Sequence, residues 1–87
     1  MNKPRRKENY RLEMIDGELL LYQPGETKIL YCNQTASLIW ELCDGTYTKE
    51  EITTFLRECY PEVAGTIASD VDETLSRFLD EGAIELV

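Results

Sequence analysis

The chain has 87 residues, of which 43% are hydrophobic and 30% charged, and its formal net charge is −8 at pH 7. This size and composition predict one folded domain with a single core. The apolar runs are too short to span a membrane, and no apolar segment follows the basic N-terminus as in a signal peptide, so we expect a cytoplasmic protein. An acidic body also disfavours binding to nucleic-acid phosphates.

The N-terminal segment differs in charge from the remainder of the chain. Residues 1–7 carry four basic groups and no acidic one. Short polar termini are usually frayed, so residues 1–9 are predicted to be a flexible basic tail in front of a domain at residues 10–87. Contact between this tail and an acidic partner is the alternative.

Three β-strands are predicted first, at Tyr10–Ile15, Glu18–Gln23 and Thr27–Cys32. The dipeptide Asp16-Gly17 suits the positive φ angles of a two-residue type I′ hairpin turn. Pro24-Gly25 has the signature of a type II turn. Together they predict an antiparallel three-stranded meander.

Three helices should follow the strands. The first begins after an N-cap at Asn33 and ends at Asp44-Gly45, with apolar residues at helical spacing: Ala36, Ile39, Trp40 and Cys43. The second opens with a capping box, Thr48 to Glu51, and ends near Tyr60-Pro61. Its expected buried residues are Ile52, Phe55, Leu56 and Cys59.

The third helix is predicted from Ser69 to Gly82, and Ala83–Val87 is long enough for one short terminal strand. Its segment Ile84 to Val87 is a candidate to cover the free edge of the first strand. The predicted fold class is therefore α+β. It is similar to a winged helix-turn-helix, with an N-terminal three-stranded antiparallel β-meander followed by three helices.

The residues that usually carry chemistry are scarce. The chain has no histidine and three widely separated cysteines, which favours small core hydrophobes over a disulfide framework or a zinc site. We therefore expect no catalytic residues, no metal and no cofactor. The third helix offers one basic residue, Arg77, among five acids, which is a poor DNA-recognition surface, although a DNA-binding regulator remains an alternative.

Several motifs follow one another along the chain in a specific order: Cys32-Asn33-Gln34-Thr35-Ala36, Ile39 to Gly45, Thr48 to Ile52, Tyr60-Pro61, Asp70-Val71 and Leu79 to Leu86. In their order and spacing they resemble the motifs of the PqqD-like proteins, the peptide chaperones of pyrroloquinoline quinone biosynthesis, and the resemblance covers roughly residues 10–87. Family members commonly carry an aliphatic residue where this chain has Cys32. A buried cysteine is a tolerable replacement.

The resemblance implies a precursor-peptide recognition element. Such domains bind the leader segment of a ribosomally made peptide and hand it to a modifying enzyme, often a radical S-adenosylmethionine (radical SAM) enzyme. Lasso-peptide and other pathways use the same module, including delivery of the precursor to a leader peptidase. We expect a monomer or weak homodimer, and an assembly module that pairs its strand edges with itself is a further alternative.

Family members are thought to receive the leader as an added strand on the third strand, in a groove walled by the third helix. The third strand carries only one charged residue, so its edge is poorly guarded, whereas the first strand carries Arg11 and Glu13. The predicted peptide-binding residues are Thr27, Lys28, Ile29, Leu30, Tyr31, Asp70, Val71, Thr74, Arg77 and Phe78. Plain core packing is the alternative for Val71 and Phe78, and a solvated surface charge for Arg77.

Overall fold

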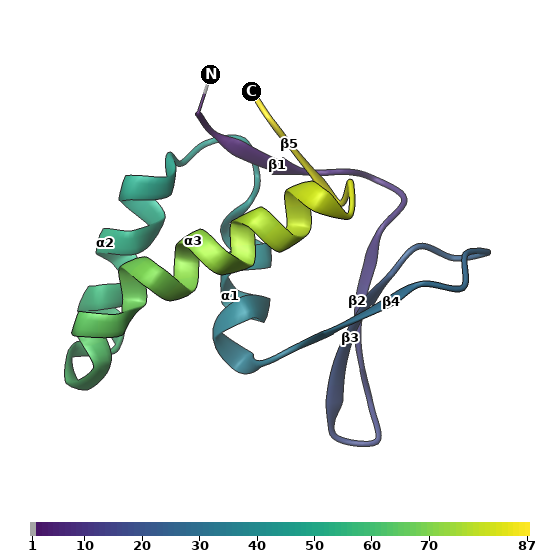
Figure 1. The fold of residues 1–87 in the computed structure, drawn as a ribbon, viewed down its shortest axis with the longest axis horizontal. Coiled ribbons are helices and arrows are strands. Elements are labelled where there is room, and N and C mark those ends of the chain that lie inside the picture. Colours follow the sequence, from purple (N-terminus) through teal and green to yellow (C-terminus); the bar gives the residue numbers. More distant parts are fainter. Residues whose placement is uncertain (1) are drawn as a thin grey trace.

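The structure is a computed structural model that describes residues 2–87. Its elements in chain order are β1 (Pro4–Arg6), β2 (Arg11–Ile15), β3 (Glu18–Tyr22), β4 (Ile29–Cys32), α1 (Gln34–Leu42), α2 (Lys49–Cys59), a single 3-10 turn η1 (Pro61–Val63), α3 (Ala64–Asp80) and β5 (Ile84–Leu86). A three-stranded antiparallel sheet followed by three helices confirms the predicted α+β class. The sheet and the helices occupy opposite sides of the molecule (Figure 1).

The sheet has the strand order β2-β3-β4 and the turns that the sequence predicts. Asp16 and Gly17 have φ angles of 52° and 80°, as a type I′ turn requires. Gly25 has a φ angle of 92°, and the amide of Glu26 donates to the carbonyl of Gln23, which closes the turn around Pro24. The predicted third strand is two residues too long at its start, because pairing ends at Tyr22↔Ile29 and residues 23–28 form the connection.

The first two helices begin at the predicted caps. The side chain of Asn33 accepts a hydrogen bond of 2.7 Å from the amide of Ala36, and Thr48 and Glu51 form a complete capping box. These bonds satisfy amide groups that have no partner within their own helix. Helix α2 ends just before Pro61, as predicted.

Helix α3 begins at Ala64, five residues before the predicted start at Ser69. The added segment contains Gly65, which has a weak helix propensity. In the structure Ile67 is 1% exposed and extends the buried stripe of α3 by one turn. Burial of this side chain offsets the weak helix propensity of the glycine.

The N-terminal segment is the main departure from the prediction. Residues 4–6 form β1, which pairs with β5 in a separate two-stranded sheet, so the expected frayed tail is wrong from Pro4 onward. Pro4 is buried, and the guanidinium of Arg6 donates to the carbonyls of Trp40 and Glu41 at the end of α1. Strand β5 consequently pairs with β1. The prediction that it covers β2 is wrong.

The core lies where the inner face of the sheet meets the three helices. Trp40 contacts the rings of Phe78 and Tyr10 edge-on, with centroids 5.4 Å and 6.3 Å apart respectively. Helix α2 lies at the periphery of the molecule (Figure 1), and its buried residues are Ile52 and Leu56. No helix within residues 2–87 is long and apolar enough to cross a bilayer.

Two residues of α2 were wrongly predicted to be buried. Phe55 is 51% exposed, and Cys59 is also exposed, because both lie on a stripe beside the one that packs. The prediction that all three cysteines are core residues therefore holds for Cys43, which is fully buried, and only partly for Cys32, which is half-buried.

Candidate functional site

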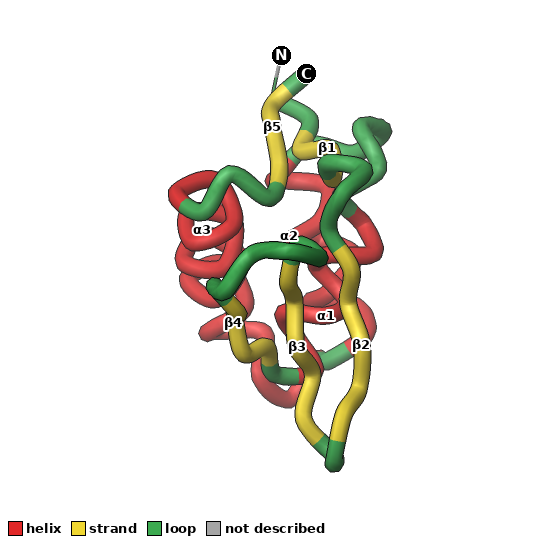
Figure 2. Tube along the Cα trace, turned by 90° about the vertical axis from the view of Figure 1, so that its right-hand side faces the viewer, coloured by secondary structure: helices red, strands yellow, loops and turns green. Residues whose placement is uncertain are grey.

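Strand β4 is the outermost strand on one side of the meander and has no further strand paired to it among the described residues. Figure 2 shows β4 at the side of the sheet nearest α3, with β2 on the far side. The side chains of Ile29 and Tyr31 are exposed on the outer face of the sheet, whereas Leu30 and Cys32 face the core. Because no further strand pairs with β4 among the described residues, its backbone edge on the side of α3 is open.

The direction of the free backbone groups follows from a contact with α3. The guanidinium of Arg77 donates to the carbonyl oxygen of Tyr31 at 3.1 Å, so this carbonyl points away from β3. Within a strand, the N–H and C=O of one residue point to the same side, and those of the next residue point to the opposite side. The N–H and C=O groups of Ile29 and Tyr31 therefore form the open edge, while those of Leu30 and Cys32 pair with β3.

Helix α3 runs antiparallel to β4, and a second contact joins the two elements. Lys28, just before β4, forms an ion pair with Glu81 at the end of α3, with 2.9 Å between Nζ and Oε2. The hydrogen bond to Glu81 raises the pKa of the Lys28 ammonium group. Two polar contacts, Arg77–Tyr31 and Lys28–Glu81, thus join the β4 side of the sheet to α3.

A polar hollow of about 320 Å³ lies between α3 and the first turn of α1. It brings together three of the predicted site residues, Asp70, Thr74 and Arg77, which recur at helical spacing along α3. Sequence reasoning missed its other lining residues, Asn33, Thr35 and Glu73. The N-cap position of Asn33 placed it at the start of α1 but gave no indication that it faces α3.

Two of the predicted peptide contacts are corrected by burial. Val71 and Phe78 are 0% exposed and belong to the core, so neither side chain is available to a ligand. They have the core-packing role that was the alternative. Thr74 is 8% exposed and forms part of the floor of the polar hollow.

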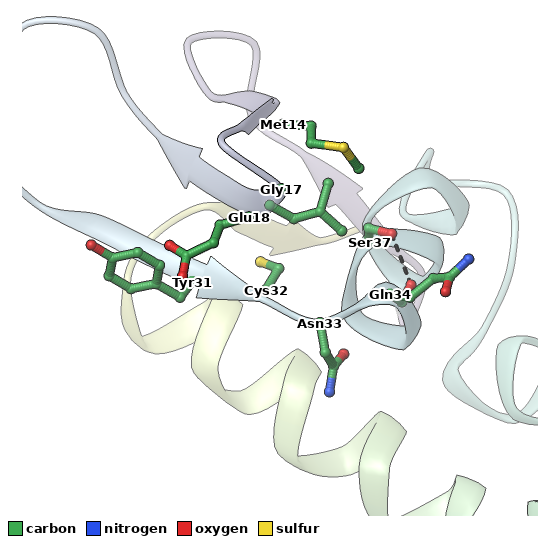
Figure 3. Close-up of a pocket in the computed structure, with 9 residues that line it drawn as sticks. Met14, Gly17, Glu18, Tyr31, Cys32, Asn33, Gln34 and Ser37 are labelled. Carbon is green, nitrogen blue, oxygen red and sulfur yellow. Dashed lines mark hydrogen bonds between the residues drawn. The ribbon is translucent and has the colours of Figure 1, made fainter.

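A larger hollow of about 630 Å³ lies on the other side of the β4 terminus, toward the tip of the β2–β3 hairpin. Its apolar wall is a row of residues paired across the sheet, Met14, Leu19 and Cys32, of which Cys32 appears in Figure 3 at the end of β4. Burial raises the pKa of the Cys32 thiol, in keeping with this apolar setting. The polar rim is formed by Gln34 and Ser37, whose hydroxyl donates to the Gln34 carbonyl. Sequence reasoning did not assign a site here.

Comparison with protein families identifies the family of the chain. Residues 18–84 match the family described as coenzyme PQQ synthesis protein D, PqqD. The chain belongs to the PqqD family. The match spans β3, β4, all three helices and the start of β5, and so includes both β4 and α3. No curated protein sequence matches the chain significantly.

The PqqD-family fold is also found in a solved structure, that of TbiB1 in complex with the TbiA(beta) leader peptide. The two chains align with a TM-score of 0.71 over 93% of this chain and 94% of the other, at 20% sequence identity. This likeness establishes a shared fold over nearly the whole chain. Within residues 2–87 no group of three or more His, Cys, Asp or Glu side chains is placed to hold a metal ion.

Proposed function

We propose that this PqqD-family protein is a non-catalytic adaptor that binds the leader segment of a ribosomally made precursor peptide and presents it to a modifying enzyme. The observation that carries the proposal is the open edge of β4 beside α3. Membership in the PqqD family supports it, and so does the shared fold with TbiB1, which is bound to a leader peptide in its own structure.

In this proposal the leader adds to β4 as a further antiparallel or parallel strand. Its backbone bonds to the N–H and C=O groups of Ile29 and Tyr31, which make no bonds to β3. Arg77 must then leave the Tyr31 carbonyl, and its guanidinium becomes free to pair with a carboxylate of the leader. At the other end of the groove, Asp70 offers a partner for a leader cation.

The proposed binding residues are those of the groove that remain after Val71 and Phe78 are removed. They are Thr27, Lys28, Ile29, Tyr31, Asp70, Thr74 and Arg77, together with Asn33. Leu30 is left out as well, because its side chain faces the core and its backbone groups pair with β3. In strand addition the free energy gained from a few backbone hydrogen bonds is partly offset by the entropy lost when a flexible peptide becomes ordered. We therefore expect a dissociation constant of about 0.1 to 10 μM, which permits release to the enzyme.

The proposed recipient is a radical SAM enzyme, by extension from the part that PqqD-family proteins have in coenzyme PQQ synthesis. DNA binding is disfavoured by the placement of the cations. Lys49 is paired with Asp72, Arg57 donates to the carbonyl of Ala64, and Arg77 contacts β4. The basic residues of α2 and α3 thus make contacts within the protein, and the surface around them is acidic.

Titration of the cognate leader into ¹⁵N-labelled protein tests this function. We expect amide shifts concentrated on residues 27–33 and 70–77, with little change at the exposed end of α2. A scrambled leader of the same composition is the control. Equal shifts with both peptides, or none with the cognate leader, would refute leader recognition at this groove.

A further inference from the structure

Helix α2 leaves an apolar surface exposed on the side of the molecule away from the sheet. Phe55 is 51% exposed and Tyr47 is 40% exposed, and together with Leu42 at the end of α1 they border a hollow of about 380 Å³. Glu51 and Glu58 flank the hollow. We name these five residues the α1–α2 patch.

The charges around this patch are segregated by helix geometry. Glu51, Phe55 and Glu58 are spaced i, i+4 and i+7 and share one face of α2. The basic residues Lys49 and Arg57 lie on the opposite face, where each contacts α3. The charged groups of the patch are therefore all acidic, and the cations that would balance them are engaged elsewhere.

We propose that the α1–α2 patch is the docking surface for the modifying enzyme, and that the enzyme's matching surface is an apolar cluster ringed by lysine and arginine. The inference rests on the proposed function, because the enzyme is the partner to which the adaptor must deliver the peptide. Aromatic side chains inside a charged rim are typical of the centres of protein interfaces. The complementary charge of the partner follows from the two glutamates.

The position of the patch suits delivery of a bound peptide. Figure 1 shows α2 on the side of the molecule opposite the β2-β3-β4 sheet, so the patch and the β4 edge are separate surfaces. The enzyme can therefore bind α2 while the leader remains in its groove. A second copy of this chain is a poor occupant, because it would bring Glu51 and Glu58 of both patches together.

The test uses two exposed substitutions, Phe55→Ala and Glu58→Lys, and measures two bindings in parallel. Biolayer interferometry measures binding to the proposed recipient, a radical SAM enzyme, and fluorescence polarisation measures binding of the labelled leader. We expect each substitution to weaken enzyme binding by about fivefold or more, the effect of losing a central contact. Leader affinity should stay within about twofold of the parent, because the groove is untouched.

Matched controls carry the same chemical changes at exposed positions away from the patch. Leu86→Ala on β5 removes an exposed apolar side chain, and Glu8→Lys reverses an exposed charge between β1 and β2. Both should bind the enzyme like the parent. Added salt should weaken enzyme binding of the parent more than that of Glu58→Lys.

Three results would overturn the docking inference. The first is that both patch variants bind the enzyme as tightly as the parent protein, and the second is that the parent protein does not bind the enzyme. The third is that the parent protein is a dimer that Phe55→Ala converts to a monomer. Failure of the proposed function gives a different result, which is the absence of leader binding by the parent protein. The two measurements thus separate an error about the patch from an error about the adaptor.

Discussion

Substitution of Ile29 by proline is the sharpest test of strand addition at β4. Ile29 is opposite Tyr22 in a pair whose backbone groups do not bond to each other, and its N–H points to the open edge. Proline removes this donor and puts its ring where the leader backbone would approach, whereas the β3–β4 ladder keeps all its bonds. One lost hydrogen bond is worth about 1 kcal/mol, so we expect leader affinity to fall by at least about fivefold.

Fluorescence polarisation with a labelled leader measures the affinity, and thermal unfolding followed by circular dichroism monitors the fold. Ile29→Ala is the matched control, because it removes the side chain from the outer face but keeps the edge N–H. We expect the proline variant to lose less than about 1 kcal/mol of stability, a fall of a few degrees in the unfolding midpoint. A folded Ile29→Pro variant that binds the leader as tightly as Ile29→Ala would refute strand addition at this edge.

Two further predictions concern the core and the N-terminal strand. A thiol reagent at about pH 8 should label the exposed Cys59 first and Cys43 only on unfolding, since burial raises the pKa of the Cys43 thiol to about 12. Mass spectrometry gives the order of labelling, and early labelling of Cys43 would contradict this prediction. Arg6→Ala should lower the free energy of unfolding in urea by about 1 to 2 kcal/mol, because it removes two bonds to the end of α1. Arg5→Ala should cost less than about 1 kcal/mol, since its ion pair with Glu85 is exposed, and equal losses in the two variants would refute this assignment.

The parts of the fold that the sequence predicted depend on local chemistry. Asp16-Gly17 determines a type I′ turn because few other dipeptides tolerate two positive φ angles. The caps at Asn33 and Thr48 bond to amides only three residues further on. Such signals lie within one turn of the chain, so a single sequence contains them in full.

The parts that were missed depend on contacts between distant residues. Strand β1 exists because Pro4 to Arg6 meet β5, some eighty residues later, and because Arg6 reaches the carbonyls at the end of α1. Helix α3 begins early because Ile67 finds a place in the core. Phe55 has the spacing of a buried residue, but the peripheral position of α2 leaves no neighbour to cover it.

The candidate site was predictable to a similar extent. Helical spacing correctly gathered Asp70, Thr74 and Arg77 on one side of α3, because that periodicity is a local property. The same periodicity did not separate this polar stripe from the neighbouring Val71 and Phe78, which are turned into the core by only a fraction of a helical turn. Tertiary packing decides which of these two adjacent stripes of α3, the polar or the apolar one, is exposed beside β4.

Arg77 is the residue whose role the structure changes most, and a double-mutant cycle can measure that role. In the free protein its guanidinium donates to the Tyr31 carbonyl, so Arg77→Ala removes a competitor of the leader backbone as well as the proposed partner of a leader carboxylate. The two effects have opposite signs, and each exposed contact is worth about 1 kcal/mol or less. With an acidic leader we expect Arg77→Ala to weaken binding by up to about fivefold, because a charge-assisted pair is stronger than a neutral bond to a carbonyl.

With a leader whose carboxylates are neutralised to amides, the partner is absent and only the competitor remains. The same Arg77→Ala substitution should then leave the affinity unchanged or raise it, because the Tyr31 carbonyl is already free. Isothermal titration of both proteins with both leaders gives the coupling between the guanidinium and the carboxylate. If Arg77→Ala weakened the binding of both leaders by the same factor, Arg77 would not pair with an acidic group of the leader, and its contribution would be the position of α3 beside β4.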